Sequence, residues 1–289
     1  IVLGGGSEEV NPNWNRFHTT ANHVYHTLLQ RRLTDDDIFY LSPSLKADRI
    51  VDATTSALQL ERAITNWAAA RVGTATPLWI YLLSHNTGTD FLLEKQAAAE
   101  ITLTAKELDY WLQQLPVGTP IYIVIEACYS GSFIPVLAKP GRVIITSTQS
   151  DKQAYIWRTS SFSRIFFNHI RSNQSLAAAF EKTEQQMAAS QIHSDQNPQF
   201  DADGNAVSNQ LGDYRALKNI YVPDDLVSLA DPPRVFDLTA TPNPLSGGLT
   251  AAVLSARVPG TQSLQVDGTI IPPDFNPSQQ FSDWLELDT

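Results

Sequence analysis

Short runs of consecutive apolar residues alternate along the chain with longer segments in which apolar residues recur at helical spacing. The apolar runs cover residues 1–3, 38–42, 78–83, 121–125 and 143–146. Helical spacing appears in residues 16–32, 55–72, 104–115, 160–171 and 174–193. Continuous apolar strands separated by helices are typical of a parallel sheet whose two faces are both covered. The pattern therefore predicts an α/β fold with a mostly parallel sheet flanked by helices on both faces.

The pattern changes near Ala230. Residues 231–289 hold eight of the 17 prolines, and segments 249–258 and 263–271 alternate like short antiparallel strands. We therefore predict two domains, an α/β domain of residues 1–228 and a small β-rich, sandwich-like module of residues 229–289 that is incomplete in this chain. A solvated, proline-rich linker is the alternative for the second part.

Charge and cysteine content narrow the function. The chain has 20 Lys and Arg against 30 Asp and Glu, a net charge of -10, so no basic excess exists to neutralise nucleic-acid phosphates. Its single cysteine excludes an intramolecular disulfide framework and a cluster of thiolate zinc ligands. The longest apolar stretches, residues 77–83 and 121–127, are too short for a membrane span. The chain opens without Met or a targeting segment, which suggests an excised or processed form.

Two reactive side chains follow neighbouring predicted strands. His85 comes just after strand 78–83, and Cys128, the only cysteine, comes after strand 121–125. The carboxyl ends of parallel strands meet at one edge of the sheet, where ligands bind. A cysteine thiolate near an imidazole is the pairing that nucleophilic catalysis needs, and the Cys128 N–H together with a turn at Gly131 would supply oxyanion donors. The alternative is a buried core cysteine and an unrelated loop histidine.

The sequence Ile-Glu-Ala-Cys-Tyr-Ser-Gly-Ser at 125–132, preceded by Ser-His-Asn-Thr-Gly at 84–88, resembles the legumain family of cysteine peptidases, which has the caspase-like fold. The start of the chain, the Trp-Asn-Arg-Phe segment at 14–17 and the segment at 161–167 extend the likeness, the last toward bacterial members. The resemblance covers roughly residues 1–222. It implies a peptidase that acts on peptides or proteins through a Cys128–His85 dyad and an acyl-enzyme.

The resemblance also implies roles for residues around the dyad. Asn86 stands where the family usually has a glycine whose N–H lines the oxyanion hole, and Asn tolerates the left-handed backbone that this geometry needs. Arg16 and Glu126 correspond to charged residues of the primary specificity pocket, which indicates cleavage after Asn, and after Asp at acidic pH. Arg or Lys is the alternative if Glu126 dominates. Ser147 and Thr148 correspond to the next pocket wall.

One acidic pocket residue of the family has no counterpart, and Ser163 lies near its place. His18, His23 and His26 share a predicted helix at a spacing that suits zinc poorly, so we expect no metal and no cofactor. Residues 201–205 resemble a calcium loop only loosely, and a polar turn is the better interpretation.

Two other functions are consistent with the same sequence features. One is a caspase-like binding or scaffold module that has lost activity, suggested by Asn86 in place of glycine. The other is a transpeptidase, because the same acyl-enzyme serves ligation. We expect the protein to act outside the cell or in the cell envelope. The sequence does not indicate an oligomeric state.

Overall fold

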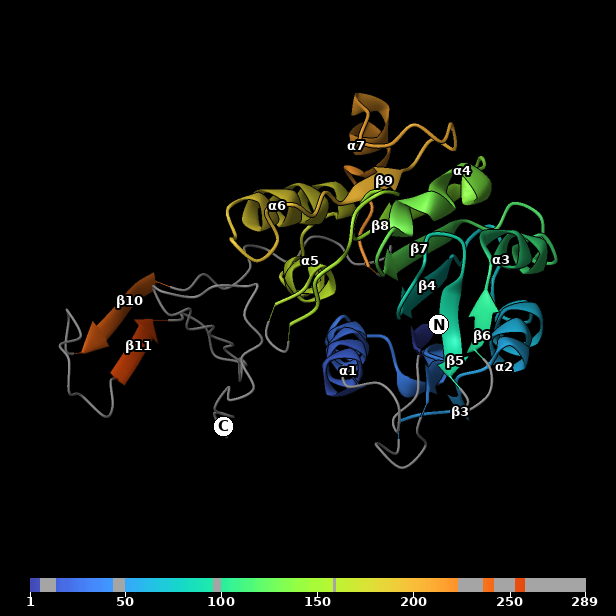
Figure 1. Cartoon of the computed structure of the whole chain (residues 1–289), viewed down its shortest axis with the longest axis horizontal. Coiled ribbons are helices and arrows are strands. Elements are labelled where there is room, and N and C mark those ends of the chain that lie inside the picture. Colours follow the sequence, from blue (N-terminus) through green and yellow to red (C-terminus); the bar gives the residue numbers. More distant parts are fainter. Residues whose placement is uncertain are drawn as a thin grey trace.

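A central sheet of seven strands organises the protein in the computed structural model, which describes residues 1–5, 14–43, 50–95, 100–157, 160–222, 236–241 and 253–257. In spatial order the strands are β3 (Ala53–Thr54), β2 (Tyr40–Ser42), β1 (Val2–Gly4), β4 (Leu78–Leu83), β7 (Ile121–Glu126), β8 (Arg142–Thr146) and β9 (Gln199–Asp201) (Figure 1). All neighbouring pairs are parallel except β8 and β9. The predicted mostly parallel sheet is thus confirmed.

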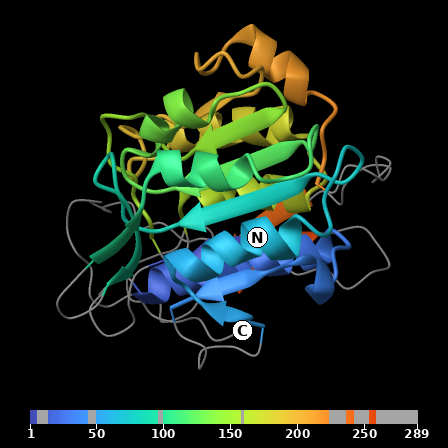
Figure 2. The same cartoon turned by 90° about the vertical axis from the view of Figure 1, so that its right-hand side faces the viewer.

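Helices cover both faces of this sheet. One face carries α1 (Trp14–Gln30), α5 (Phe162–Arg171) and α6 (Leu176–Ala188), and α7 (Leu211–Leu217) packs on α6. The other face carries α2 (Ala57–Arg62), a π-helical turn over Ala63–Ala68, α3 (Ala105–Leu112) and α4 (Ile134–Leu137). Figure 2 turns this second face toward the viewer. None of the helices in the described ranges is long and apolar enough to cross a membrane.

Alternating side chains of the strands build two separate cores. In β7, Tyr122 and Val124 pack with α1, α5 and α6, whereas Ile123 and Ile125 pack with α2, α3 and α4. Side chains of a strand point alternately to the two faces, so a strand covered on both faces must be apolar throughout. This explains why the sequence of β7 reads as an unbroken apolar run.

Several helices begin at a polar residue that caps their N-terminus. Ser56 accepts a hydrogen bond from the Gln59 N–H at the start of α2, and Ser161 accepts one from the Arg164 N–H at the start of α5. A Thr104–Glu107 capping box precedes α3, with the Thr104 N–H donating to Glu107 Oε2 at 2.9 Å. The predicted helix over residues 55–72 is correct in place, but its second half is π-helical.

Several short elements were not predicted. Besides β3, β9, α4 and α7, they are the antiparallel pair β5 (Phe91–Lys95) and β6 (Glu100–Leu103) and the 3₁₀ turns at Asp35–Asp37 and Ser130–Phe133. In the C-terminal part, β10 (Phe236–Thr241) and β11 (Val253–Arg257) pair antiparallel. The predicted strand at 263–271 and the domain boundary at 228/229 lie outside the described residues, so the two-domain division stays a prediction.

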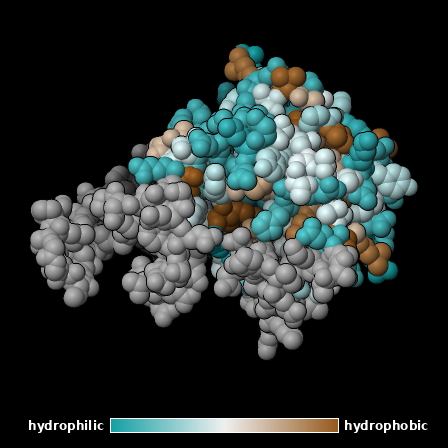
Figure 3. Space-filling model, in the orientation of Figure 1, coloured by the Kyte–Doolittle hydropathy of each residue, from teal (hydrophilic) through white to brown (hydrophobic). Residues whose placement is uncertain are grey.

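The surface shown in Figure 3 mixes hydrophilic and hydrophobic residues. Among the described residues, the exposed large apolar side chains are Leu58, Tyr110, Val117, Tyr155, Val207 and Leu211. They come from separate elements, and single exposed apolar residues are normal for globular proteins. Only Tyr155 lies at the pocket described next.

Candidate active site

Four of the residues singled out from the sequence, His85, Cys128, Ser147 and Thr148, follow three adjacent strands. β4 and β7 pair so that Leu83 lies opposite Glu126, and the Ser84 N–H donates to the Glu126 carbonyl at 3.3 Å. β7 pairs in turn with β8, so the segment around Ser147 lies beside the end of β7. The structure therefore brings the loops that carry His85, Cys128 and Ser147 to one edge of the sheet.

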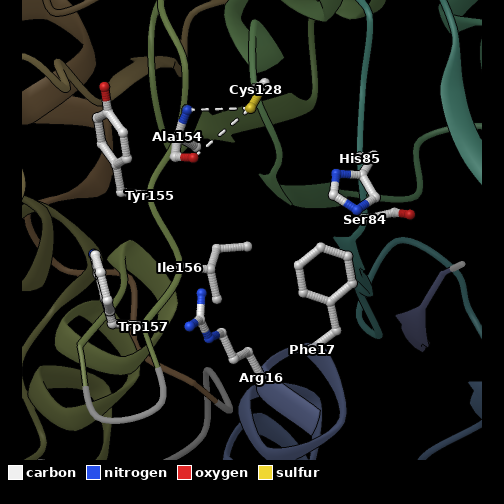
Figure 4. A pocket seen from close by; sticks show the side chains of 9 residues that line it. All are labelled: Arg16, Phe17, Ser84, His85, Cys128, Ala154, Tyr155, Ile156 and Trp157. Carbon is white, nitrogen blue, oxygen red and sulfur yellow. Dashed lines mark hydrogen bonds between the residues drawn. The ribbon is translucent and has the colours of Figure 1, made fainter. Parts of the chain in front are cut away.

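An open pocket of about 200 Å³ lies at this edge. Its lining residues are Arg16, Phe17, Ser84, His85, Cys128, Ala154, Tyr155, Ile156 and Trp157. Figure 4 shows Cys128 and His85 on either side of the upper part of this pocket, with Phe17 and Arg16 of α1 below. The sequence placed Cys128, His85 and Arg16 here, and the structure brings these three side chains to a common space.

The sulfur of Cys128 is half-buried against the main chain of Ala154. The Ala154 N–H donates to Sγ at 3.4 Å, and the Ala154 carbonyl lies 3.7 Å from Sγ. Tyr129, the next residue, has a left-handed backbone with φ 56°, and its N–H donates to the Lys152 carbonyl at 2.7 Å. Cys128 thus immediately precedes a left-handed, strained residue at the end of β7, and such strain is typical of functional sites.

The turn after Cys128 depends on a close backbone approach at Gly131. A Cβ at this position would lie 2.7 Å from the Ser150 nitrogen. The Gly131 N–H donates to the Thr148 carbonyl at 2.9 Å. Glycine at position 131 is thus required for packing the turn against the loop after β8.

His85 makes contacts through its backbone and through its ring. Its carbonyl accepts a hydrogen bond from the Leu92 N–H at 2.8 Å, and its ring lies 5.0 Å from that of Phe17, measured between centroids. The imidazole is exposed and borders the pocket opposite Cys128 (Figure 4). An imidazole in this position can exchange protons with a group bound in the pocket.

The loops after β4 and β7 each carry a backbone N–H that the sequence predicts as an oxyanion donor. Asn86 does not adopt the left-handed backbone considered for it, since it is not among the described non-glycine residues with positive φ. Asn86 is buried, and its side-chain Nδ2 donates to the Cys128 carbonyl at 2.8 Å while its Oδ1 accepts from the Gly88 N–H at 3.2 Å. Neither the Asn86 N–H nor the Cys128 N–H has a hydrogen-bond partner within the described ranges. Two unused N–H groups on tied loops are suited to binding an oxyanion.

Arg16 contributes a cation to the pocket. Its guanidinium carbon lies 5.1 Å from the centre of the Trp157 ring, in cation–π geometry. Both side chains line the pocket. A planar donor placed on an aromatic ring is well suited to binding a carboxamide or carboxylate.

Glu126 does not line the pocket. It is fully buried, and its Oε2 accepts hydrogen bonds from the Ser161 hydroxyl at 3.2 Å and from the Ser163 N–H at 3.3 Å. Burial raises the pKa of this carboxyl to about 7. Its Oε1 has no hydrogen-bond partner in the described part of the chain. The carboxyl therefore lies behind the lining residues, next to Ser163, rather than on the pocket surface.

Ser147 and Thr148 are also fully buried and are not lining residues. The Ser147 hydroxyl donates to the Ala127 carbonyl and accepts from the Ala127 N–H, both at 3.2 Å. The Thr148 carbonyl accepts from the Gly131 N–H. These residues thus hold the loop that carries Cys128, and the wall of the pocket is built elsewhere.

That wall consists of Ala154, Tyr155, Ile156 and Trp157, which the sequence reading missed. The segment is neither helix nor strand, so no periodicity marks it. The one available signal was its place, a loop between the end of β8 and the start of α5. Phe17, next to Arg16, was also missed as a lining residue.

The acidic turn at residues 201–205 is built by its own hydrogen bonds. Asp201 accepts from the Gly204 and Ala206 N–H groups at 2.9 and 2.6 Å, and Asp213 accepts from the Ala202 N–H at 2.8 Å. In the described ranges, one group of acidic, His or Cys side chains lies close enough together to hold a metal ion. It consists of Asp201, Asp203 and Asp213. Their bonding to N–H groups is that of a polar turn.

The comparisons with known proteins bear on this arrangement. The family model described as the Peptidase C13 family, the legumain family, matches residues 67–207. Caspase-1 from Spodoptera frugiperda is 14% identical over 70% of this chain and 84% of its own, with a TM-score of 0.49. Protein GSU0716 from Geobacter sulfurreducens is 12% identical over 75% of this chain and 95% of its own, with a TM-score of 0.43. No curated protein matches significantly.

The family match spans β4, β7 and β8 together with the loops that hold His85 and Cys128. It also includes the pocket wall at 154–157. It therefore supports the resemblance to the legumain family over this segment.

Proposed function

We propose that the protein is a cysteine endopeptidase of legumain type, in which Cys128 is the nucleophile and His85 the general acid and base. The observation that carries this proposal is the placement of both side chains on one pocket, from the ends of two paired strands, inside the segment that the peptidase family model matches. A thiol and an imidazole facing the same bound group can perform acyl transfer.

The reaction proceeds in two stages. His85 takes the proton of the Cys128 thiol, and the thiolate attacks the carbonyl carbon of the scissile bond. The oxyanion that forms is bound by the Cys128 and Asn86 N–H groups. The bond to nitrogen breaks as His85 gives its proton to the leaving amine, which leaves a thioester on Cys128. His85 then takes a proton from water as its oxygen attacks the thioester carbonyl. The carbon–sulfur bond breaks, the carboxylic acid is released, and His85 returns the proton to the sulfur of Cys128.

We also propose that the protein cleaves after Asn. Arg16 lines the pocket and can donate to the carbonyl oxygen of an Asn side chain. An Arg side chain of the substrate would instead meet the Arg16 cation. Because Glu126 lies behind the lining residues, we assign it no direct contact with the substrate and expect its influence to act through Ser161 and Ser163.

A peptide library tests the activity without assuming a sequence preference. Wild type, Cys128→Ala and Ser132→Ala are incubated with peptides of mixed sequence, and new termini are identified by mass spectrometry. Ser132 lies in the same turn, and its hydroxyl has no hydrogen-bond partner among the described residues, so it is a matched control. We expect new termini with wild type and Ser132→Ala and none with Cys128→Ala. Absence of cleavage by folded wild type would instead favour an inactive binding module.

A further inference from the structure

The pocket wall is held from behind by a buried glutamine. The Tyr155 N–H donates to Gln196 Oε1 at 3.0 Å, and Gln196 Nε2 donates to the Ser147 carbonyl at 2.9 Å. Gln196 is only 2% exposed. It follows α6 in the chain, more than forty residues from the wall, and it joins the wall to the end of β8.

A buried histidine supports this glutamine. His193 Nδ1 lies 3.2 Å from Gln196 Oε1, and His193 Nε2 lies 2.9 Å from the Ser160 hydroxyl. The contacts of Tyr155 and Ser147 fix which end of the Gln196 amide is oxygen, so Nδ1 carries the proton and Nε2 accepts from Ser160. Burial lowers the pKa of His193 to about 4, which keeps the ring neutral at neutral pH.

These bonds hold both ends of the wall. Tyr155, held by Gln196, follows Ala154, whose N–H contacts the Cys128 sulfur. At the other end, the Trp157 N–H donates to the carbonyl of Ser160, whose hydroxyl His193 holds. Ala154, which contacts the sulfur, is therefore linked to Gln196 through Tyr155, and Trp157, which contacts Arg16, is linked to His193 through Ser160.

We propose that Gln196 and His193 are positioning residues that hold the wall in place, so that the Ala154 N–H stays on the Cys128 sulfur and Trp157 stays under Arg16. Their side-chain hydrogen bonds outside the pair go to Tyr155 in the wall, to Ser160 just after it and to Ser147 at the end of β8. A buried polar pair costs desolvation that an apolar pair avoids. A hydrogen bond donated to sulfur favours the thiolate, so the wall affects both reactivity and substrate binding.

The proposal rests on the proposed function only for its effect on peptide cleavage, so the test has a second readout. Gln196→Met keeps the size of the side chain and removes its hydrogen bonds to Tyr155 and Ser147. Gln196→Glu keeps the acceptor for the Tyr155 N–H. Ser160→Ala is a milder change that removes only the partner of His193 Nε2. Thr183→Val is the control, because it deletes a buried hydrogen bond that stays within α6.

Two quantities are measured on folded protein, the pH midpoint of Cys128 alkylation by iodoacetamide and the KM for peptide. The chargeable groups lining the pocket with Cys128 are Arg16, His85 and Tyr155, and no variant changes them. For Gln196→Met we expect the midpoint to move up by about half a pH unit and KM to rise about fivefold, from the loss of one or two hydrogen bonds. Ser160→Ala should show smaller changes in the same direction. Gln196→Glu adds a carboxyl behind the wall, so it is compared by KM alone, which should rise less than in Gln196→Met.

The outcomes separate this inference from the proposed function. A shifted midpoint in a protein that cleaves no peptide would support the positioning role while contradicting the peptidase. Active protein in which Gln196→Met and Ser160→Ala leave both quantities at the Thr183→Val values would overturn the positioning role and leave the peptidase standing. If Gln196→Met does not fold, Ser160→Ala decides in the same way.

Discussion

The side-chain amide of Asn86 donates a hydrogen bond to the main-chain carbonyl of Cys128 at 2.8 Å. This contact ties the loop after β4 to the loop after β7, so the two proposed oxyanion donors are held relative to each other. The residue that departs from the pattern of the legumain family is therefore integrated into the site. Its role as an oxyanion donor remains a prediction.

Asn86→Ala tests this tie. The substitution removes the bonds to Cys128 and Gly88 while the backbone N–H remains. Losing a buried hydrogen bond costs about 1 kcal/mol, so we expect kcat/KM for peptide cleavage to fall about fivefold to tenfold. The measurement is steady-state hydrolysis of a fluorogenic peptide. Thr87→Ala is the control, because Thr87 is the exposed neighbouring residue. Equal rates for both variants would contradict the tie.

Arg16→Leu tests the specificity. Substrates that differ only in Asn, Asp, Arg or Leu before the scissile bond are compared with wild type and the variant. We expect wild type to prefer Asn, and the variant to lose about tenfold to a hundredfold in kcat/KM for Asn, because a hydrogen bond from a cation is worth about 1.5–3 kcal/mol.

Arg71→Leu is the matched control for Arg16→Leu. Arg71 lies over the Trp67 ring at 4.7 Å, in the same cation–π arrangement but away from the pocket. The control should keep the wild-type preference. Clear preference of wild type for Arg over Asn would show that Arg16 does not contact the substrate side chain.

Glu126→Gln tests the buried carboxyl. Its pKa is about 7 in the folded protein, against 4.5 for an ordinary Glu. The folded state therefore binds this proton more tightly than the unfolded state, and the carboxyl's contribution to stability is lost as pH rises from 4.5 through 7. Gln stays neutral and can still accept from Ser161 and Ser163.

We expect Glu126→Gln to match wild type near pH 4.5 and to be more stable by about 3 kcal/mol at pH 8. Urea unfolding followed by circular dichroism at the two pH values measures the difference. A stability difference that is the same at both pH values would mean that the carboxyl titrates normally despite its burial.

Truncation tests the domain boundary. The described α/β part ends at Val222, which is 2% exposed and whose carbonyl accepts from Arg31 Nε at 2.8 Å. A chain ending at Asp225 should fold with its helical signal intact. A chain ending at Lys218 loses this bond and the one from the Leu176 N–H to the Ile220 carbonyl, so we expect it to be less stable by about 2–4 kcal/mol. Aggregation of the longer chain would place the C-terminal segment in the core.

The sequence predicts the sheet and its functional edge because both depend on local patterns. Strands β4 and β7 are unbroken apolar runs, and His85 and Cys128 come directly after them. The parallel pairing of these strands then brings the two side chains to one pocket. The glycine at 131 was likewise recognisable as part of a tight turn.

Other parts of the site depend on contacts between distant segments. The wall at 154–157 has no regular structure, and Gln196 meets Tyr155 across forty-one positions of sequence. Glu126 was expected in the pocket by resemblance, but the Ser161 hydroxyl and the Ser163 main-chain N–H at the start of α5 bind its buried carboxyl. Burial of this kind depends on how distant segments pack, so it cannot be predicted from the spacing of residues in the sequence.

The most direct measurement of the central claim is the mass of the enzyme during turnover. Wild type is mixed with a peptide that it cleaves, quenched with acid within one turnover, and analysed by intact mass and peptide mapping. We expect a fraction of the protein to carry the acyl portion of the peptide as a thioester on Cys128, and His85→Ala to form it far more slowly. Cleavage that proceeds in Cys128→Ala, or turnover without any adduct on Cys128, would contradict a Cys128 acyl-enzyme.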